Sequence, residues 1–351
     1  MDEKKLLIIL GSMGRGGAER VISLISDYVC KKGWKVYIVL LLFNKVDYEV
    51  NNNVSIINLT GNTNSRIKRL PGWIVGIRRI LREIKPDCLL SFAARINIIS
   101  LLSCIGLKQK IVISERNDPY MDGRTKIIDF MTKILYPKAD AIVFQTKRAQ
   151  SYFENVKFKR IYRIPNPIFV SKKAENMNLN KIVSVGRLTE QKNHKMLIDA
   201  FYDLHFDLPE VKLYIYGEGE LKDELLQYVE KLNIERFVIF KGNVNNVHEQ
   251  IADAAVFVLS STYEGLSNAL LEAMSMGLPC ISTNCAGADE YIINYENGLL
   301  VPINNKNQLY KAMKKMLNDR QLREKCKKEA LLIEKKVSAE VVLKDWYDVL
   351  N

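Results

Sequence analysis

Two glutamates, Glu264 and Glu272, stand eight residues apart in the most informative stretch of the sequence. The apolar run 254–260 precedes the first glutamate and is typical of a buried strand. The segment 269–276 has helical composition and ends at Gly277, a residue that favours a helix C-terminus. The first carboxylate is therefore predicted in a strand-to-helix turn, and the second about two turns into the helix.

The turn between the two glutamates has the features of an anion site. Gly265, Leu266 and Ser267 present backbone N–H groups at the start of the predicted helix. Unpaired donors and the helix dipole both stabilise a negative group there. One carboxylate on each side of a phosphate-binding turn suits a ligand whose hydroxyl groups flank a phosphate. A nucleotide-sugar has this shape.

Two cations follow the first predicted strand of the second half. Gly186 and Arg187 come directly after the strand 181–185, and Lys192 stands five residues further on. An arginine fork and a lysine point charge are well suited to a diphosphate. Open α/β sheets bind ligands outside the carboxyl ends of their strands, so these cations are expected beside Glu264.

Two glycine-rich turns each have two interpretations. Gly217 and Gly219 either admit a nucleotide base close to the backbone or form a plain turn. Gly16 and Gly17 lie in the turn 11–20, which either approaches a diphosphate or simply needs small residues. This turn lacks the G-x-G-x-x-G spacing and an acidic residue after the second strand, which argues against dinucleotide binding.

A polar cluster, Ser114–Pro119, follows a predicted strand of the first half. It either orients the hydroxyl groups of a sugar or acceptor, or forms an Asx-type turn before a helix. We expect Glu115 and Asn117 from this cluster, with Glu19 and Arg20 from the first glycine turn, to bind the acceptor.

The histidines and carboxylates show no metal-ligand pattern. His194, His205 and His248 are far apart, and there is no Asp-x-Asp pair, so no divalent metal site is predicted. His194 follows Lys192 closely and is expected at the edge of the phosphate site, whereas the other two are interpreted as surface residues.

Composition indicates a globular protein of two α/β domains. The chain has 351 residues, of which 48% are hydrophobic and 26% charged, which is ordinary for soluble proteins. No apolar run reaches the roughly 18–20 residues that span a bilayer. No signal peptide is recognised at the N-terminus. Six cysteines without a C-x-x-C pair indicate free thiols in a reducing cytoplasm.

Strands alternate with amphipathic helices in both halves, which predicts parallel sheets in α/β layers. Strands are predicted at 6–10, 35–42, 54–59, 88–92, 110–114, 141–144, 181–185, 212–216, 238–240, 255–259 and 279–282. The predicted organisation is a first domain 1–168, a polar linker 169–180, a second domain 181–338, and a C-terminal helix 339–351 that packs back on the first domain.

The net charge of +12 is concentrated in the first half, where residues 1–170 carry 29 Lys and Arg against 14 Asp and Glu. This half is expected to face nucleic acid or an acidic membrane surface. A basic helix, 74–85, carries Arg78, Arg79 and Arg82 opposite an apolar face. With Trp73 it either lies on anionic headgroups or packs on the sheet with a solvated basic face. Nucleic-acid binding needs several stacking aromatics, and this stretch offers only one.

Taken together, these segments resemble the family 4 glycosyltransferases of the GT-B fold, in which two Rossmann-like parallel-sheet domains face each other across a cleft. The resemblance covers nearly the whole chain and is carried by GGAER (Gly16–Arg20), SERNDP (Ser114–Pro119), IPNP (Ile164–Pro167), VGRL with a following lysine (Val185–Lys192), GEGE (Gly217–Glu220) and E-x7-E (Glu264–Glu272).

The resemblance implies roles for particular residues. Arg187 and Lys192 would hold the donor diphosphate, Glu272 would bond the ribose, and Glu264 would contact hydroxyls of the donor sugar. Family members retain the anomeric configuration and need no metal or other cofactor. Arg116 stands where many members have a histidine that contacts the donor sugar, and is assigned to the catalytic set for this reason.

The SERNDP form resembles a subgroup that adds sugars, often N-acetylgalactosamine, to polyprenyl-diphosphate-linked glycans. The predicted function is therefore transfer of a hexose or N-acetylhexosamine from a UDP-sugar to a lipid-linked glycan, in surface polysaccharide or glycoprotein glycan synthesis. The enzyme is expected to be cytoplasmic and peripheral to the cell membrane. A nucleotide-sugar epimerase and a non-catalytic nucleotide-sugar-binding protein of the same fold are the alternatives.

Overall fold

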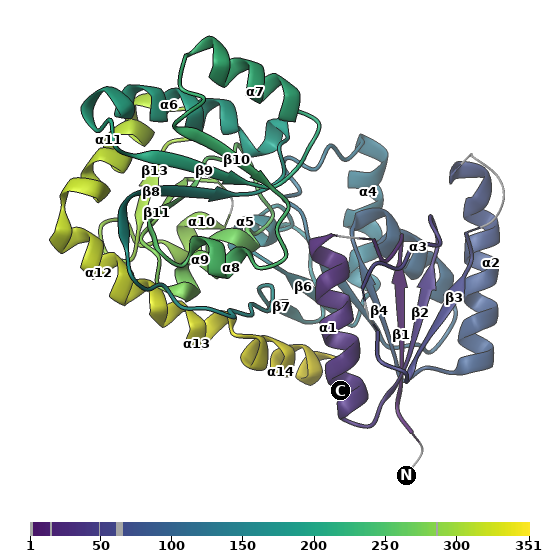
Figure 1. Ribbon diagram of the computed structural model, residues 1–351. Helices are drawn as coiled ribbons and strands as arrows, with labels where there is room; N and C mark the ends of the chain where they lie inside the picture. The colour runs from purple at the N-terminus through teal and green to yellow at the C-terminus, as the bar shows by residue number, and fades with distance from the viewer. Residues whose placement is uncertain (1–2, 15, 49, 61–65, 286) are drawn as a thin grey trace. The chain divides into compact units, whose positions relative to one another are not determined.

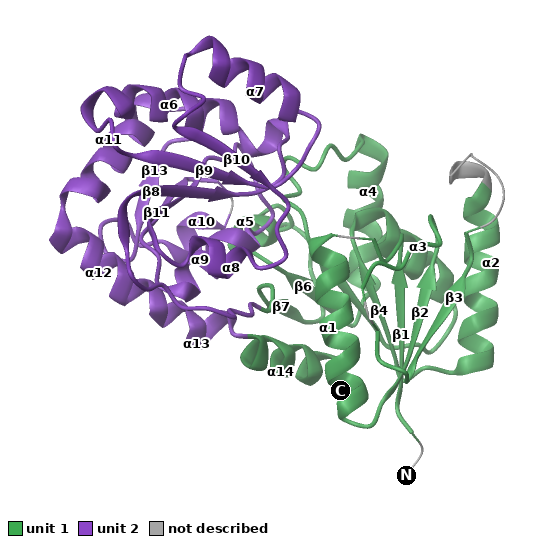
Figure 2. Cartoon of the chain, viewed as in Figure 1, with its two compact units in different colours: residues 1–167, 339–351 green, residues 168–338 purple. Residues whose placement is uncertain are grey.

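The computed structural model describes residues 3–351 except 15, 49, 61–65 and 286. For residues 66–68 it describes the backbone but not the side chains. The chain divides into two compact units, coloured separately in Figure 2. Unit 1 comprises residues 1–167 and 339–351, and unit 2 comprises residues 168–338.

Unit 1 contains a sheet of seven parallel strands in the order β3-β2-β1-β4-β5-β6-β7 (Figure 1). The strands are β1 Lys5–Leu10, β2 Lys35–Leu40, β3 Val54–Asn58, β4 Cys88–Phe92, β5 Ile111–Glu115, β6 Ala141–Phe144 and β7 Ile161–Arg163. The helices are α1 Gly17–Lys31, α2 Arg66–Ile84, α3 Ala94–Cys104, α4 Lys126–Leu135, α5 Lys147–Ser151 and α14 Ala339–Leu350. The strand order reverses between β1 and β4, as in doubly wound folds.

Both faces of the unit 1 sheet are covered, which explains its continuous apolar strands. Side chains alternate across a strand. Leu6 and Ile8 therefore pack with α1 and α14, whereas Leu7 and Ile9 pack with α2 and α3 on the opposite face. A strand with only one buried face would instead alternate apolar and polar residues.

Helix α14 completes the core of unit 1, although it is the last helix of the chain. Its Trp346 is fully buried, and the indole lies against the ring of Phe92 with 5.5 Å between centroids. Val342 and Leu350 join the same core. The first unit is therefore built from both ends of the sequence.

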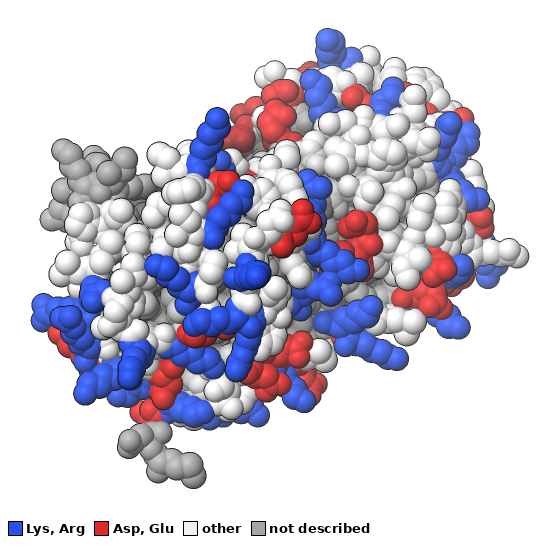
Figure 3. Space-filling view, turned by 180° about the vertical axis from the view of Figure 1, so that it is seen from behind, with Lys and Arg blue, Asp and Glu red and all other residues white. Residues whose placement is uncertain are grey.

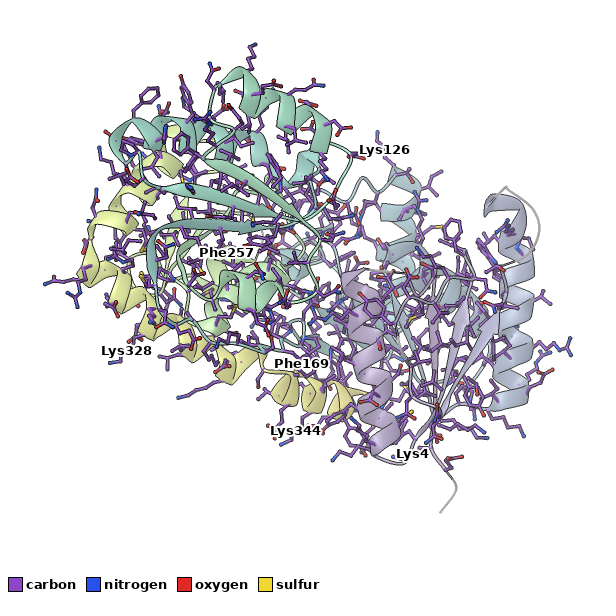
Figure 4. The ribbon with its side chains drawn as sticks, in the orientation of Figure 1. Lys4, Lys126, Phe169, Phe257, Lys328 and Lys344 are labelled. Carbon is purple, nitrogen blue, oxygen red and sulfur yellow. The ribbon has the colours of Figure 1, made fainter. Side chains whose placement is uncertain are left out.

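Unit 2 repeats the same architecture with six parallel strands in the order β10-β9-β8-β11-β12-β13. The strands are β8 Asn178–Val185, β9 Lys212–Tyr216, β10 Val238–Gly242, β11 Ala254–Leu259, β12 Cys280–Thr283 and β13 Leu299–Val301. The helices are α6 His194–Asp207, α7 Lys222–Lys231, α8 Val247–Ile251, α9 Asn268–Met276, α10 Ala288–Tyr291, α11 Lys306–Asn318, α12 Arg320–Ala330 and α13 Glu334–Val337. The order reverses between β8 and β11. Phe257, on β11, is fully buried inside this unit (Figure 4).

The segment 169–180, predicted as a polar linker, lies within unit 2. The Ala174 N–H donates to the Met276 carbonyl at 2.8 Å, and the Glu175 N–H donates to the Ala252 carbonyl at 2.9 Å. Strand β8 already begins at Asn178. Most of its polar side chains are exposed, whereas Val170, Ala174 and Met177 pack against unit 2 and the backbone is hydrogen-bonded to it. Backbone hydrogen bonds of this kind leave no mark on composition.

Helix α2 differs from the predicted surface helix in one respect. The Trp73 side chain is buried, and its indole N–H donates to the Leu59 carbonyl at 3.0 Å, so it belongs to the core. Arg79 is exposed and pairs with Glu83 at 2.7 Å. Within the described residues, no helix combines the length and the apolar character needed to cross a bilayer.

Candidate functional site

The predicted phosphate-binding residues gather at the point where the strand order of unit 2 reverses. Strands β8 and β11 are parallel neighbours, so the loops after them leave the sheet at the same edge. Residues 186–192 follow β8 and residues 260–267 follow β11. Ligands of doubly wound sheets bind at this reversal, outside the carboxyl ends of the strands.

A buried ion pair joins these two loops. The Lys192 ammonium lies 2.5 Å from Oε1 of Glu264, and the two side chains are 14% and 7% exposed. The Ser261 hydroxyl also donates to Oε1 at 2.6 Å, and the Gln191 amide donates to Oε2 at 3.4 Å. The Glu264 carboxylate is therefore fixed by donors from both loops, and its small exposed area adjoins the edge of the sheet.

Further hydrogen bonds hold the loops in register. The Ser260 hydroxyl donates to the Lys192 carbonyl at 2.8 Å, and the Thr262 N–H donates to the Gln191 carbonyl at 2.9 Å. The Gln191 amide donates in return to the Tyr263 carbonyl at 2.9 Å. Sequence reasoning missed Gln191 and its partners because single Ser, Thr and Gln residues have no spacing that marks them.

The strand-to-helix turn after Glu264 offers unpaired donors. Ser267 caps α9 by accepting a hydrogen bond from the Leu270 N–H at 3.4 Å, while the buried Leu266 anchors the turn. The N–H groups of residues 265–267 make no hydrogen bond within the described part of the chain. Such groups at a helix start favour an anion.

Arg187 supplies a second positive group on the same edge. It is exposed, directly follows the residue after β8, and has no acidic partner among the residues that the structure describes. Lys192, by contrast, is held close to Glu264. The two predicted diphosphate-binding cations therefore differ in their surroundings, because Lys192 is held in an ion pair and Arg187 is exposed without one.

Gly217 and Gly219 allow the loops after β8 and β9 to touch. Gly217 has a φ of +135°, and a Cβ there would lie 2.0 Å from the Gly186 carbonyl oxygen. A Cβ on Gly219 would lie 2.3 Å from the Leu188 carbonyl oxygen. Contact between the two loops is thus a sufficient reason for both glycines, and a contact with a nucleotide base stays a prediction.

Glu272 lies beside a histidine that was interpreted as a surface residue, and that interpretation is wrong. The His248 Nε2 is 3.5 Å from Oε2 of Glu272, and each side chain is only 12% exposed. The Ser171 N–H donates to the other ring nitrogen of His248 at 3.3 Å. These three residues are distant in sequence, so no motif could have connected them.

His194 does not line the phosphate site as predicted. The side chain is 2% exposed as the first residue of α6. Burial, together with the nearby positive charge of Lys192, lowers the pKa of His194 to about 4. The imidazole is therefore neutral at pH 7 and belongs to the packing beneath the loop.

In unit 1, the carboxylate of Glu115 is sealed. Its oxygens accept hydrogen bonds from the Tyr136 hydroxyl and, at 3.1 Å, from the Arg124 guanidinium. Burial raises the pKa of Glu115, and the positive charge of Arg124 opposes that rise. The structure thus gives Glu115 a packing role, and it does not bring this carboxylate to the surface where an acceptor would bind.

Arg116 points the other way, into an aromatic cage of the same unit. Its guanidinium carbon lies 5.0 Å from the Phe92 ring centre and 5.9 Å from that of Trp346, and it donates to the Asn166 side chain. Burial lowers the pKa of Arg116 to about 9. The adjacent Asn117 is exposed at the same edge.

The first glycine turn places a carboxylate at the start of α1. A Cβ on Gly16 would lie 2.1 Å from Oε2 of Glu19, so this side chain folds back over the glycine. Burial raises the pKa of Glu19. Gly17 begins α1, followed by Arg20 in the first turn. Glu19 therefore occupies the position at this helix start that an anion would otherwise favour.

The structure thus collects the predicted residues into two groups. The group on unit 2 comprises Arg187, Lys192, Gly217, Gly219, Glu264, Gly265, Leu266, Ser267 and Glu272. The group on unit 1 comprises Gly16, Gly17, Glu19, Arg20, Glu115, Arg116 and Asn117.

Two family models match the chain, one for each half. Residues 15–172 match the model of Glycosyltransferase Family 4, and residues 166–332 match that of Glycosyl transferases group 1. Together they include both groups of predicted residues.

Two similar proteins come from Campylobacter jejuni. One is N-acetylgalactosamine-N,N'-diacetylbacillosaminyl-diphospho-undecaprenol 4-alpha-N-acetylgalactosaminyltransferase, 33% identical over 93% of this chain and 94% of its own length. The other is an alpha-1,4-N-acetyl-D-galactosaminyltransferase acting on a GalNAc-containing glycan on diphospho-undecaprenol, 31% identical over 91% of this chain and 90% of its own length.

Solved structures share the fold at low sequence identity. HepE of Anabaena, in complex with UDP, has a TM-score of 0.82 with 16% identity, covering 99% of both chains. The apo form of the lipopolysaccharide outer core galactosyltransferase WaaB has a TM-score of 0.80 with 19% identity, covering 99% of this chain and 98% of its own. The predicted fold class, two Rossmann-like parallel-sheet domains, is confirmed.

Proposed function

This chain belongs to the family 4 glycosyltransferases of the GT-B fold, and we propose that it transfers an N-acetylhexosamine or hexose from a UDP-sugar to a polyprenyl-diphosphate-linked glycan. The observation that carries the proposal is the Lys192–Glu264 pair beside the unpaired N–H groups of residues 265–267. A cation, a carboxylate and backbone donors then share one edge of unit 2.

The positive groups of unit 2 act on the leaving group. Breaking the bond between the anomeric carbon and the phosphate oxygen builds negative charge on the departing diphosphate. Lys192 and the N–H groups of residues 265–267 stabilise that charge in the transition state, because they are already oriented before the reaction. The exposed Arg187 adds a second positive charge at the same edge. These groups do what a divalent metal does in other transferases. Independence from metal is part of the proposal.

The two glutamates position the donor rather than transfer protons. Glu264 is held by Lys192 and Ser261, so its exposed edge can receive sugar hydroxyl groups in a fixed geometry. Glu272 bonds the ribose, oriented by His248. The acceptor hydroxyl attacks the anomeric carbon from the face that the diphosphate leaves. Its proton passes to the departing phosphate oxygen, and the configuration is retained.

The acceptor and the donor sugar are proposed from the relatives. Both Campylobacter jejuni proteins are named as N-acetylgalactosaminyltransferases that act on glycans linked to diphospho-undecaprenol. We therefore propose UDP-N-acetylgalactosamine as the donor and a glycan on a polyprenyl diphosphate as the acceptor. Such an acceptor places the reaction at the cytoplasmic face of the cell membrane, in synthesis of capsule, lipopolysaccharide or glycoprotein glycans. Unit 1 is the acceptor-binding unit in this proposal.

A transfer assay tests the proposal. The protein is incubated with UDP-N-acetylgalactosamine and a short-chain polyprenyl-diphosphate glycan, with and without EDTA, and the product is identified by mass and anomeric NMR. An α-linked product formed equally with EDTA supports the proposal. Conversion of the UDP-sugar without any acceptor indicates an epimerase instead, and UDP binding without turnover indicates a non-catalytic binder.

Thermal-shift screening narrows the donor in parallel. UDP, GDP, ADP and their sugars are compared, because a ligand that binds only the folded state raises its apparent stability. Stabilisation by a GDP- or ADP-sugar alone contradicts the proposed UDP-sugar donor.

A further inference from the structure

An apolar line runs along the outer face of α4, where a solvated helix would carry polar residues. Ile127, Phe130 and Ile134 are 72%, 65% and 49% exposed. Their spacing of three and four residues places them on one side of the helix, and Lys138, four residues further, continues the line just beyond its end. We name these three apolar residues the α4 stripe.

The α4 stripe is not needed for packing. The opposite side of the helix already supplies the core contacts of unit 1, through the buried Thr132 and Leu135 and the partly buried Ile128. Two lysines border the stripe. Lys126 begins the helix at the surface (Figure 4), and Lys133 is exposed beside it. An exposed apolar line between lysines has the composition of a helix that lies at a membrane interface.

A basic pocket of about 980 Å³ lies where β5, β6 and β7 begin. Its charged lining consists of Lys108, Lys110, Lys138, Lys159, Arg160 and Asp140. Ile105, 48% exposed, contributes an apolar wall. We call this site the basic pocket.

The positive charge of the basic pocket is largely uncompensated. Asp140 accepts hydrogen bonds from Lys159 at 2.8 Å and from the Ile111 N–H at 2.9 Å, so it is already occupied. Lys108, Lys138 and Arg160 have no acidic partner among the residues described. The rear view in Figure 3 shows Lys and Arg gathered on the lower part of unit 1. The pocket is therefore suited to a phosphate group.

The α4 stripe and the basic pocket meet at Lys138, which continues the stripe and lines the pocket. In a bilayer, the headgroup phosphates lie directly outside the hydrocarbon core. A basic pocket next to an apolar surface can therefore contact both layers at once. We propose that unit 1 docks on anionic membranes by inserting the α4 stripe and binding a phospholipid headgroup phosphate in the basic pocket. This inference rests on the proposed function, because that function places the acceptor in a membrane.

The headgroup site is separate from the transfer site. The basic pocket lies at the amino-terminal ends of the strands, whereas Arg116 and Asn117 lie just after the carboxyl end of β5. A five-residue strand separates the two edges by about 15 Å. A bound phospholipid therefore does not compete with the lipid-linked acceptor.

Helix α2, which the sequence singled out for membrane contact, offers a matched control. Its apolar residues Trp73 and Ile77 are buried, and Val75 is the single strongly exposed large apolar side chain on the described part of the helix. The exposed Arg79 and Arg82 therefore have no apolar line beside them. Reversing two charges on α2 changes the net charge of unit 1 as much as reversing two in the basic pocket.

Vesicle flotation tests the proposal with the full chain. Wild type is expected to bind phosphatidylglycerol vesicles and to bind phosphatidylcholine vesicles weakly. The Lys138→Glu, Arg160→Glu variant should lose about 25-fold or more in partition to anionic vesicles, since each lysine or arginine near the surface contributes roughly fivefold. The Arg79→Glu, Arg82→Glu control should lose clearly less, and an equal loss overturns the headgroup pocket.

The apolar part is tested by Ile127→Ser with Phe130→Ser. This variant should lose about 100-fold in partition, including at high salt where charge attraction is screened, because two large side chains no longer enter the bilayer. Unchanged binding overturns insertion of the α4 stripe. Circular dichroism and thermal melting should match wild type, because both side chains are exposed.

Other occupants give different results. Displacement of the protein from vesicles by millimolar inorganic phosphate, at constant ionic strength, indicates a soluble-anion site and overturns the docking proposal. A wild-type dimer in solution that Phe130→Ser converts to a monomer indicates a second copy on the stripe and also overturns it. Transfer to a water-soluble acceptor is measured in parallel. If the protein does not transfer sugar to this acceptor but still binds vesicles, the proposed function is contradicted and the docking proposal is not.

Discussion

Two buried glutamates, one in each unit, have opposite surroundings. Glu264 and Glu115 both lie near the carboxyl end of a central strand, and each pairs with a cation. Lys192, the partner of Glu264, is partly exposed and adjoins unpaired N–H groups. Arg124, the partner of Glu115, is buried, and the Tyr136 hydroxyl completes the seal.

The difference shows that a buried ion pair does not by itself mark a functional site. In the closed group, Arg124 pairs with both Glu115 and Asp122, and the one guanidinium nitrogen left without a partner, Nη1, is buried and therefore not offered to a ligand. The Lys192–Glu264 pair keeps one edge open to solvent. The unpaired N–H groups of residues 265–267 beside an open pair, rather than an ion pair as such, distinguish the site of unit 2.

Breaking the closed pair should have the largest effect on stability. Arg124→Met leaves the Glu115 carboxylate buried without its cation, which typically costs about 3–5 kcal/mol of unfolding free energy. Urea denaturation measures this. The control Lys133→Met removes an exposed pair with Asp129 and should cost less than about 1 kcal/mol. If Arg124→Met and Lys133→Met lose the same unfolding free energy, Glu115 is not sealed from solvent. Adding Glu115→Gln to Arg124→Met should restore part of the lost stability, because it removes the unpaired buried charge.

The neutral histidine beneath the open pair should make stability depend on pH. Unfolded histidine binds a proton below about pH 6.5, whereas folded His194 does so only near its lowered pKa of about 4. The unfolded state therefore binds more protons between these values. Stability should fall by about 3 kcal/mol as the pH drops from 6.5 to 4.

His194→Gln isolates this contribution from that of the carboxylates. Urea midpoints of wild type and variant are compared at pH 7 and pH 4.5. The wild type should lose more stability than the variant over this interval. Parallel losses would mean that His194 is protonated in the folded protein.

Removing either cation of the open site should slow transfer. Lys192→Ala and Arg187→Ala are each expected to lower turnover about 100-fold, the effect typical of losing one oxyanion donor. Lys195→Ala, the same charge change on the exposed side of α6, should leave turnover near wild type. Near-normal turnover in Arg187→Ala or Lys192→Ala would contradict the assignment of the diphosphate site to these residues of unit 2.

The smallest effect is expected from neutralising the open carboxylate. Glu264→Gln keeps the shape of the side chain and should lower turnover roughly tenfold, about 1.4 kcal/mol in the activation free energy. Affinity for free UDP, measured by calorimetry, should stay near wild type because Glu264 is proposed to face the sugar. A matching loss of UDP affinity contradicts that assignment.

The sequence allowed the sheets and the unit 2 turn to be predicted because both have strong local signals. Strand β11, Ala254–Leu259, is an apolar run buried on both faces, and α9 begins at Asn268 as its composition predicts. Strands β7 and β13 have only three residues each, too few for any periodicity, and they were missed.

Side-chain partners could not be predicted, because they join residues that are distant in sequence. Glu115 meets Tyr136 across 21 positions, and nothing in SERNDP shows that its glutamate turns inward. The contact between His248 and Glu272 could not be predicted for the same reason. The α4 stripe was missed for another reason, since an amphipathic pattern gives the spacing of an apolar line but not which side meets the core.

The return of α14 to unit 1 reverses the usual order of folding during synthesis. Domains generally fold as they leave the ribosome, the N-terminal one first. Here the nascent unit 1 lacks Trp346 and its neighbours until residues 339–351 are made, whereas unit 2 is continuous in sequence. Unit 2 can therefore complete its core first. The earlier-made sheet of unit 1 keeps an open apolar face, around Phe92, until α14 is made.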